Sequence, residues 1–300
     1  MFMDRVLRLR AGQLRWLAPL ASLAMLAVVL PAAHGDSTCD QFGATPVDGG
    51  RYIVQNNEWN SNSPQCVNTT GGTGWTVSTG DQNAGTDGPP GSYPSIYRGC
   101  HWGRCTTGSG LPVQVSRLGP ASSSWSTTEP QSGAYDTSYD IWFNSTPTTS
   151  GQPDGAELMI WLNSRGGVRP AGSMVGTATI DGATWQVWKT RMNSWNYIAY
   201  VRESPTTAVN GLDIRAFTQD AESRGSVQPS WYLMDVEAGF ELWQGGHGMT
   251  TNSFSFDPSG GAPASYRAAP DHRSRRHSSH SRRRKVTRRH RASAPAGPRR

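Results

Sequence analysis

The sequence feature that most constrains the fold is residues 156–162, an apolar run that contains a single carboxylate, Glu157. In a β-strand, successive side chains point to opposite faces. One face of this strand would carry Leu158, Ile160 and Leu162, and the other Glu157, Met159 and Trp161. A wholly aliphatic face requires a second layer to cover it. The face with the carboxylate is therefore expected to line a cleft.

A second stretch, residues 232–243, shows the same alternation. One face would carry Tyr232, Met234, Val236, Ala238, Phe240 and Leu242, and the other Leu233, Asp235, Glu237, Gly239, Glu241 and Trp243. A lone Glu157 is most simply a strand-end residue that faces water, and this second stretch argues against that interpretation. Two strands that present Glu and Trp suggest paired carboxylates flanked by aromatic rings, an arrangement that cleaves glycosidic bonds. The alternation alone does not distinguish Glu237 from Glu241.

The segment that contains both stretches, residues 36–257, has the composition of a β-protein. It is rich in Gly, Ser, Thr and Trp, with Asp-Gly or Asn-Gly turn signals at residues 48, 87, 181 and 210. Short runs with β-branched and aromatic residues lie between the turns, at 51–56, 75–79, 111–116, 139–144, 185–189 and 197–201. This spacing predicts an all-β sandwich or barrel. Only residues 212–224 have helical periodicity, so we expect one short helix.

Tryptophan is unusually frequent in this segment, which holds eleven of the twelve Trp residues of the chain. Some of them are expected to fill the core of a sandwich. Sugar rings also present flat C–H faces that stack on indoles. Trp59, Trp102 and Trp161 lie near turns and acidic strands, and they are candidate platforms for sugar binding.

The first 35 residues have the pattern of a signal peptide. Four arginines precede an apolar segment at 16–33, and a small-residue cleavage pattern, Ala33-His34-Gly35, follows. An uncleaved membrane anchor is the alternative, because the apolar segment approaches spanning length. Prolines at positions 19 and 31 favour cleavage. We therefore expect a secreted, extracellular protein with no membrane span once the signal is removed.

Cysteine content agrees with export. Cys39, Cys66, Cys100 and Cys105 all lie in the first third of the mature chain. An even number of cysteines in an exported protein predicts two disulfides, for which three pairings can be drawn. Pairing of neighbours would join Cys39 to Cys66 and Cys100 to Cys105. A zinc site is the alternative, but the chain lacks a CxxC pair and an oxidising compartment disfavours zinc.

The C-terminal residues 258–300 form a basic tail. Residues 267–300 contain 12 Arg and one Lys against one Asp, a net charge of +12. Residues 36–257 hold 11 basic and 20 acidic residues, a net charge of −9. The tail has almost no apolar residues, so disorder is predicted. Retention on anionic cell-wall polymers, binding of nucleic acid without sequence specificity, or no role at all are the three interpretations.

Five segments together resemble glycoside hydrolase family 12, a family of small secreted endo-β-1,4-glucanases. In chain order they are Gln55–Trp59, Ser92–Ser95, Tyr139–Trp142, Glu157–Trp161 and Gly239–Trp243. The similarity extends over residues 39–256 and includes the Cys100 to Cys105 loop. The resemblance implies a β-jelly roll of two curved antiparallel sheets, with an open substrate cleft on the concave side.

The resemblance also implies roles for the acids. Glu157 matches the nucleophile, Glu241 matches the acid/base, and Asp140 matches an aspartate that hydrogen-bonds and orients the nucleophile. Glu237 is then structural or makes a modest substrate contact. Two positions depart from the family pattern: Leu242, where Pro is frequent, and Ala171, where a larger aliphatic residue is common. Both changes are apolar and concern loop shape more than chemistry.

The remaining family matches concern the substrate. Candidate substrate-binding residues are Asn57, Trp59, Tyr93, His101, Trp102, Met159 and Trp161. His101 has a second interpretation as a residue that only braces the small disulfide loop, since it directly follows Cys100. We expect a monomeric, retaining endo-β-1,4-glucanase that acts on internal bonds of cellulose-type β-glucans by double displacement, without metal or cofactor. The alternatives are a xyloglucan-specific endoglucanase and a non-catalytic glucan-binding jelly roll.

Overall fold

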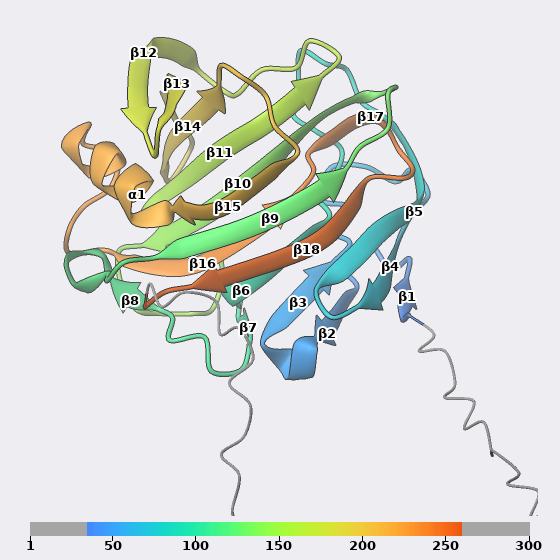
Figure 1. Ribbon diagram of the computed structural model, residues 1–300, viewed down its shortest axis with the longest axis horizontal. Coiled ribbons are helices and arrows are strands. Elements are labelled where there is room, and N and C mark those ends of the chain that lie inside the picture. The colour runs from blue at the N-terminus through green and yellow to red at the C-terminus, as the bar shows by residue number, and fades with distance from the viewer. Residues whose placement is uncertain (1–34, 260–300) are drawn as a thin grey trace, which may run out of the picture. The chain divides into compact units, whose positions relative to one another are not determined.

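The computed structural model describes residues 35–259, so almost all of the predicted signal peptide and basic tail lie outside the described residues. Within this range the chain forms eighteen strands and one α-helix (Figure 1). The strands are β1 (Ser37–Thr38), β2 (Ala44–Val47), β3 (Tyr52–Gln55), β4 (Gln65–Gly71), β5 (Gly74–Asn83), β6 (Ser95–His101), β7 (Arg104–Cys105), β8 (Val113–Gln114), β9 (Ser122–Thr128), β10 (Ala134–Asn144), β11 (Ala156–Arg165), β12 (Ser173–Ile180), β13 (Ala183–Arg191), β14 (Asn196–Arg202), β15 (Ala208–Asp213), β16 (Tyr232–Gly239), β17 (Leu242–Gly246) and β18 (Thr250–Asp257). The helix is α1 (Ile214–Ser223).

The strand pairings define two layers. The first sheet has the order β1-β4-β5-β18-β9-β15. The second has the order β2-β3-β6-β16-β10-β11-β14-β13-β12. Every pair is antiparallel except β11 with β14, which is parallel. β17 pairs with both β10 and β5 and so links the two sheets at one edge. The all-β sandwich with one short helix is confirmed.

The core lies between the two sheets. Trp125 of β9 contacts Tyr139 of β10 at 5.2 Å and Phe240 at 5.9 Å between ring centroids, so aromatic side chains join the layers. β11 contributes Leu158, Ile160 and Leu162 to this core, as the alternation predicts. Its opposite face places Met159 and Trp161 in a second apolar cluster, outside the core between the sheets.

The alternation in residues 232–243 holds only in part. Val236, Ala238, Phe240 and Leu242 lie in the core as predicted, but Leu233 lies there too. In the pairing of β16 with β10, Trp142 is opposite Asp235 and Phe143 is opposite Leu233, so the register skips Met234. This β-bulge adds one residue and reverses the alternation beyond it. The predicted side of Leu233 is therefore wrong.

One predicted strand is mostly absent. Of residues 111–116, only Val113–Gln114 form a strand (β8), and Val115–Arg117 form a 3₁₀ turn. Pro112 has no N–H to donate to a strand ladder, which limits extension in that direction. The other five predicted runs lie within or overlap β3, β5, β10, β13 and β14.

The predicted helix is confirmed as α1. Asp213 caps its N-terminus, because the Asp213 carboxylate accepts a hydrogen bond of 3.0 Å from the backbone N–H of Ala216. Phe217 anchors the helix, with ring contacts to Trp185 at 4.9 Å and to Tyr200 at 5.2 Å. Within residues 35–259, no helix combines the length and the apolar character needed to span a membrane.

Both disulfides join neighbouring cysteines. Cys39 is bonded to Cys66, and Cys100 is bonded to Cys105 across the short β6–β7 pair. All four cysteines are thereby oxidised. The zinc alternative for these residues is wrong.

Candidate active site

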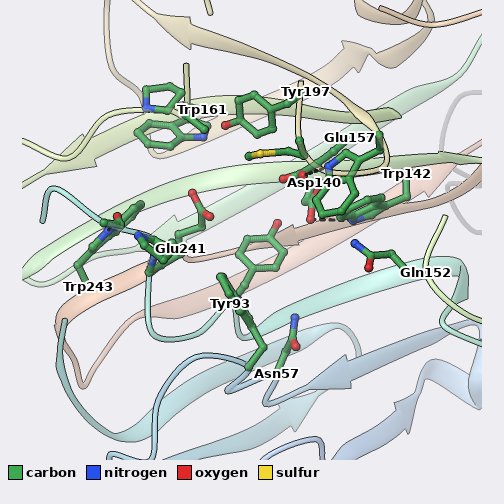
Figure 2. A pocket seen from close by; sticks show the side chains of 18 of the residues that line it. Asn57, Tyr93, Asp140, Trp142, Gln152, Glu157, Trp161, Tyr197, Glu241 and Trp243 are labelled. Carbon is green, nitrogen blue, oxygen red and sulfur yellow. Dashed lines mark hydrogen bonds between the residues drawn. The ribbon is translucent and has the colours of Figure 1, made fainter. Parts of the chain in front are cut away.

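The second sheet carries a cleft of ≈ 1140 Å³ whose wall includes Glu157, Glu241 and Asp140 (Figure 2). These three acids come from β11, from the connection between β16 and β17, and from β10, respectively. The two glutamates lie on the same cleft although more than eighty residues separate them in the sequence. The geometry therefore brings together the three acids that the sequence singles out.

Glu157 is held by β11, where it lies opposite Trp142 of β10 and beside Tyr197 of β14. Its Oε2 accepts a hydrogen bond of 2.7 Å from the indole N–H of Trp195. Burial raises the pKa of Glu157, the Trp195 N–H opposes this rise, and the charge of Glu241 adds to it. Trp195 lies in the turn before β14, and no strand pattern in the sequence points to it.

Glu241 lies between the end of β16 and the start of β17. The amide of Phe240 donates to the Pro94 carbonyl (3.1 Å), and that of Leu242 donates to the Ser92 carbonyl (3.0 Å). These bonds fix the backbone on both sides of Glu241, with Phe240 in the core and Trp243 on the cleft side. Burial raises the pKa of Glu241 well above its usual range, and the adjacent Asp136 carboxyl raises it further.

Asp140 is nearly buried, with 9% of its surface exposed. Its Oδ2 accepts a hydrogen bond of 2.9 Å from the indole N–H of Trp142, whereas the buried Oδ1 has no partner among the described residues. Burial and then the charges of Glu157 and Glu237 raise its pKa well above the usual range. A protonated Asp140 is a hydrogen-bond donor, and Figure 2 shows its side chain next to that of Glu157.

A second acidic cluster lies beside Asp140 on the neighbouring strand β16, where Glu237 is the cross-strand partner of Asp140. Glu237 is fully buried, and its Oε2 accepts hydrogen bonds from Gln55 (2.9 Å) and Ser95 (2.8 Å). His101 Nδ1 lies 2.5 Å from Glu237 Oε1 and 3.9 Å from Asp235 Oδ2. One ligand atom from each of these three residues falls within 4.8 Å of the others, a set that could hold a metal ion. The close contact between His101 and Glu237 already uses two of these atoms. Of the two readings of Glu237, the structure supports the structural one.

Six of the seven predicted substrate-binding residues line the cleft: Asn57, Trp59, Tyr93, His101, Trp102 and Trp161. The exception is Met159, which is 2% exposed and lies beneath the surface. Its sulfur accepts a hydrogen bond of 3.2 Å from the Tyr197 hydroxyl. Met159 therefore supports Tyr197, which itself lines the cleft.

Aromatic side chains flank the acids on two sides. On one side, Trp142 contacts Trp102 at 5.1 Å and Trp195 at 5.6 Å between ring centroids. On the other, Trp161 and Trp243 are 6.3 Å apart. Trp59 and Trp102 remain 47% and 39% exposed, which leaves ring faces open to a ligand. The cleft residues that were not among the predicted substrate-binding residues include Trp142, Gln152, Trp195, Tyr197 and Trp243.

A β-sandwich whose cleft holds paired carboxylates between indole side chains defines a glycoside hydrolase. Residues 50–258 match the family described as Glycosyl hydrolase family 12. The chain belongs to this family.

Known proteins of similar sequence and structure agree with this membership. The structure of endoglucanase cel12A from Rhodothermus marinus shares 45% identity and a TM-score of 0.71, over 74% of this chain and 97% of that one. A probable cellulase, Cel12b, of Mycobacterium tuberculosis is 37% identical over 148 residues, 49% of this chain and 97% of its own length. A family 12 xyloglucanase from Bacillus licheniformis shares 28% identity and a TM-score of 0.66, over 74% of this chain and 98% of that one.

Proposed function

We propose that the protein is a retaining endo-β-1,4-glucanase in which Glu157 is the nucleophile and Glu241 is the acid/base. The observation that carries the proposal is the different environment of two carboxyl groups on one cleft. The Glu157 carboxylate accepts a hydrogen bond from the indole N–H of Trp195, which favours the charged form of Glu157. Glu241 lies against a second carboxyl group, which favours its protonated form. At one pH, such environments allow Glu157 to be ionised and act as the nucleophile while Glu241 is protonated and acts as the acid.

The proposed reaction begins with Glu157 ionised and Glu241 protonated. Glu157 attacks the anomeric carbon while Glu241 gives its proton to the departing glycosidic oxygen, so the C–O bond breaks and a glycosyl-enzyme forms. Water then attacks the same carbon. Glu241 takes a proton from that water, and Glu157 leaves as a carboxylate. Two displacements at one carbon retain the anomeric configuration.

Asp140 is proposed to orient the nucleophile. Its Trp142 hydrogen bond fixes one oxygen, and the partnerless Oδ1 is free to donate to Glu157 when Asp140 is protonated. The aromatic groups on either side of the acids supply stacking surfaces for several sugar units. A chain bound along both groups would be cleaved internally, which favours an endo mode of action.

The preferred glucan is proposed to be a cellulose-type β-1,4-glucan. Support comes from the Rhodothermus marinus and Mycobacterium tuberculosis relatives, which are named as an endoglucanase and a probable cellulase. The Bacillus licheniformis relative is named as a xyloglucanase, so xyloglucan is the second candidate. Secretion is proposed from the N-terminal signal pattern and is supported by the two disulfides, which form in oxidising compartments.

The test uses the chain without residues 1–35, with matched Glu157→Gln, Glu241→Gln and Glu203→Gln variants. Glu203 is exposed, so its variant is the control. Reducing-sugar release from a soluble β-1,4-glucan should fall about 10²- to 10⁴-fold in Glu241→Gln, which loses acid catalysis. Reducing-sugar release by Glu157→Gln should fall at least as far, and release by the Glu203→Gln control should equal that of the parent protein.

An aryl β-cellobioside with an activated leaving group separates the two roles. This substrate needs no acid in the first step, so Glu241→Gln should release the aryl group in a burst whereas Glu157→Gln should not. The first product seen by NMR should be the β-anomer. An initial α-anomer would contradict retention, faster turnover of xyloglucan would select the second candidate, and glucan binding without hydrolysis by the parent would favour a non-catalytic module.

A further inference from the structure

Asp136 is a buried acid on β10 that the proposed reaction does not use. It is fully buried, and it precedes Asp140 by four residues on the same strand. Its backbone N–H donates a hydrogen bond of 3.1 Å to the carbonyl oxygen of Glu241. The neighbouring residue, Tyr135, is paired with Leu242 of β17. The backbone register thus fixes Asp136 directly beside Glu241.

The carboxyl groups of Asp136 and Glu241 lie within hydrogen-bond reach of each other. Both Asp136 oxygens are buried and have no well-formed hydrogen bond, and the groups in contact with them are the Glu241 carboxyl group, the Glu241 backbone and the Ser138 side chain. A buried acceptor without a partner destabilises the fold, and two adjacent buried carboxylates also repel each other. One proton held between the two groups removes both penalties.

The location of that proton follows from the two environments. Burial raises the pKa of both groups. Contact with Glu241 opposes the rise in the pKa of Asp136, whereas contact with Asp136 adds to the rise in the pKa of Glu241. Of the two, Glu241 lines the cleft and Asp136 does not, so the shared proton can reach a substrate only from Glu241, with Asp136 as the hydrogen-bond acceptor.

We propose that Asp136 is a positioning residue that shares one proton with Glu241 and holds this proton on the acid/base until it passes to the glycosidic oxygen. The inference rests on the proposed role of Glu241. After transfer, the C–O bond is broken, the leaving sugar carries the proton, and two carboxylates are left in contact. Their repulsion favours uptake of a proton by Glu241 from the attacking water, which restores the shared-proton state.

Other titratable groups also face this site. They are Asp140 of β10, Glu157 of β11, Tyr197 of β14 and Tyr93 of the segment before β6. The charge of Glu241 raises the pKa of Asp140 and of Glu157, whereas Asp136 is the residue in hydrogen-bond contact with Glu241. Substitution of Asp136 alone therefore isolates the shared proton.

The test is Asp136→Asn, which keeps the size and the backbone hydrogen bond but removes the charge. With ¹³C-labelled carboxyl groups, NMR titration should show the pKa of Glu241 falling by about one unit or more. The pH profile of kcat/KM should shift, while the midpoint of urea unfolding should change little. Asp81→Asn, at an exposed acid of β5, is the control and should leave both titration and profile unchanged.

A measurement on the unaltered enzyme keeps the inference testable if Asp136→Asn does not fold. The carboxyl carbons of Asp136 and Glu241 should each report the same two titration steps, because a pair that shares a proton titrates as a unit. Independent single-step titrations, or an unchanged pKa of Glu241 in Asp136→Asn, would overturn the inference. Activity that survives Glu241→Gln would instead overturn the proposed function, so the two failures are distinguishable.

Discussion

At the scale of single residues, the Trp195 indole controls the charge of Glu157. Its N–H donates the 2.7 Å hydrogen bond to Oε2, and this contact lowers the pKa that burial raises. In Trp195→Phe the hydrogen bond is lost, so the pKa of Glu157 should rise. Because the nucleophile must be ionised, the acidic limb of the kcat/KM profile should move to higher pH. A hydrogen bond to a charged group contributes about 1.5–3 kcal/mol, so activity at acidic pH should fall about tenfold to a hundredfold.

Trp188→Phe is the matched control for this prediction. The Trp188 indole N–H is buried but makes no hydrogen bond in the described residues, and Trp188 does not line the cleft. The same change of side chain there should leave the pH profile in place. An acidic limb that stays at the same pH in Trp195→Phe would contradict the assigned role of the indole.

The residue scale also shows what the sequence can and cannot reveal about the site. Glu157 could be predicted because strand alternation separates its face from an aliphatic one. Alternation also places Asp136 on the same face of its strand as Asp140 and Trp142. Only the pairing of β10 with β17 shows that Asp136 lies beside Glu241. Trp195 could not be predicted, because a turn before β14 delivers its side chain and no periodicity fixes the direction of a turn residue.

At the scale of elements, the two faces of β11 contribute separately to stability and to catalysis, since one face packs in the core and the other lines the cleft. Leu158→Ala should therefore lower stability without removing catalytic groups. Leu158 is fully buried in the core, and truncation of such a residue costs about 2–5 kcal/mol. The urea midpoint should fall, with specific activity retained at low temperature. Met174→Ala on β12, where the side chain is 46% exposed, should change the midpoint little. Equal midpoints for the two variants would contradict the two-face description of β11.

Strand patterns predict the fold class well because burial and alternation are local properties of the chain. They fail where the ladder is irregular, as at the bulge that skips Met234 and at Pro112, because hydrogen-bond register depends on the partner strand. The order of strands within each sheet, including the parallel pair of β11 and β14, is set by contacts between distant segments. No periodicity within a single strand encodes that order. The resemblance to a known family implied two curved sheets and a cleft, but it did not give the order of the strands.

At the scale of the whole molecule, the dominant feature is the separation of charge along the chain. The net charge is −9 in residues 36–257 and +12 in residues 267–300. The overall charge of +6 therefore describes neither part. An acidic enzyme has no electrostatic attraction to an anionic polymer, whereas a basic segment on the same chain provides one. Adsorption to such a polymer should then depend on the tail and not on the cleft.

Removal of residues 260–300 tests this dependence. The chain from residue 36 to its C-terminus should adsorb to an anionic polysaccharide gel such as polygalacturonate at low salt, and the truncated chain should not. In 1 M NaCl the full chain should also be released, because the Debye length falls to about 3 Å. Hydrolysis of a soluble neutral glucan should be equal in both proteins, since the family match ends at residue 258 and the residues that line the cleft lie between Phe42 and Trp243. Equal adsorption of the two proteins at low salt would show that the tail does not retain the enzyme on anionic polymers. Adsorption that survives high salt would point to a contact that charge does not govern.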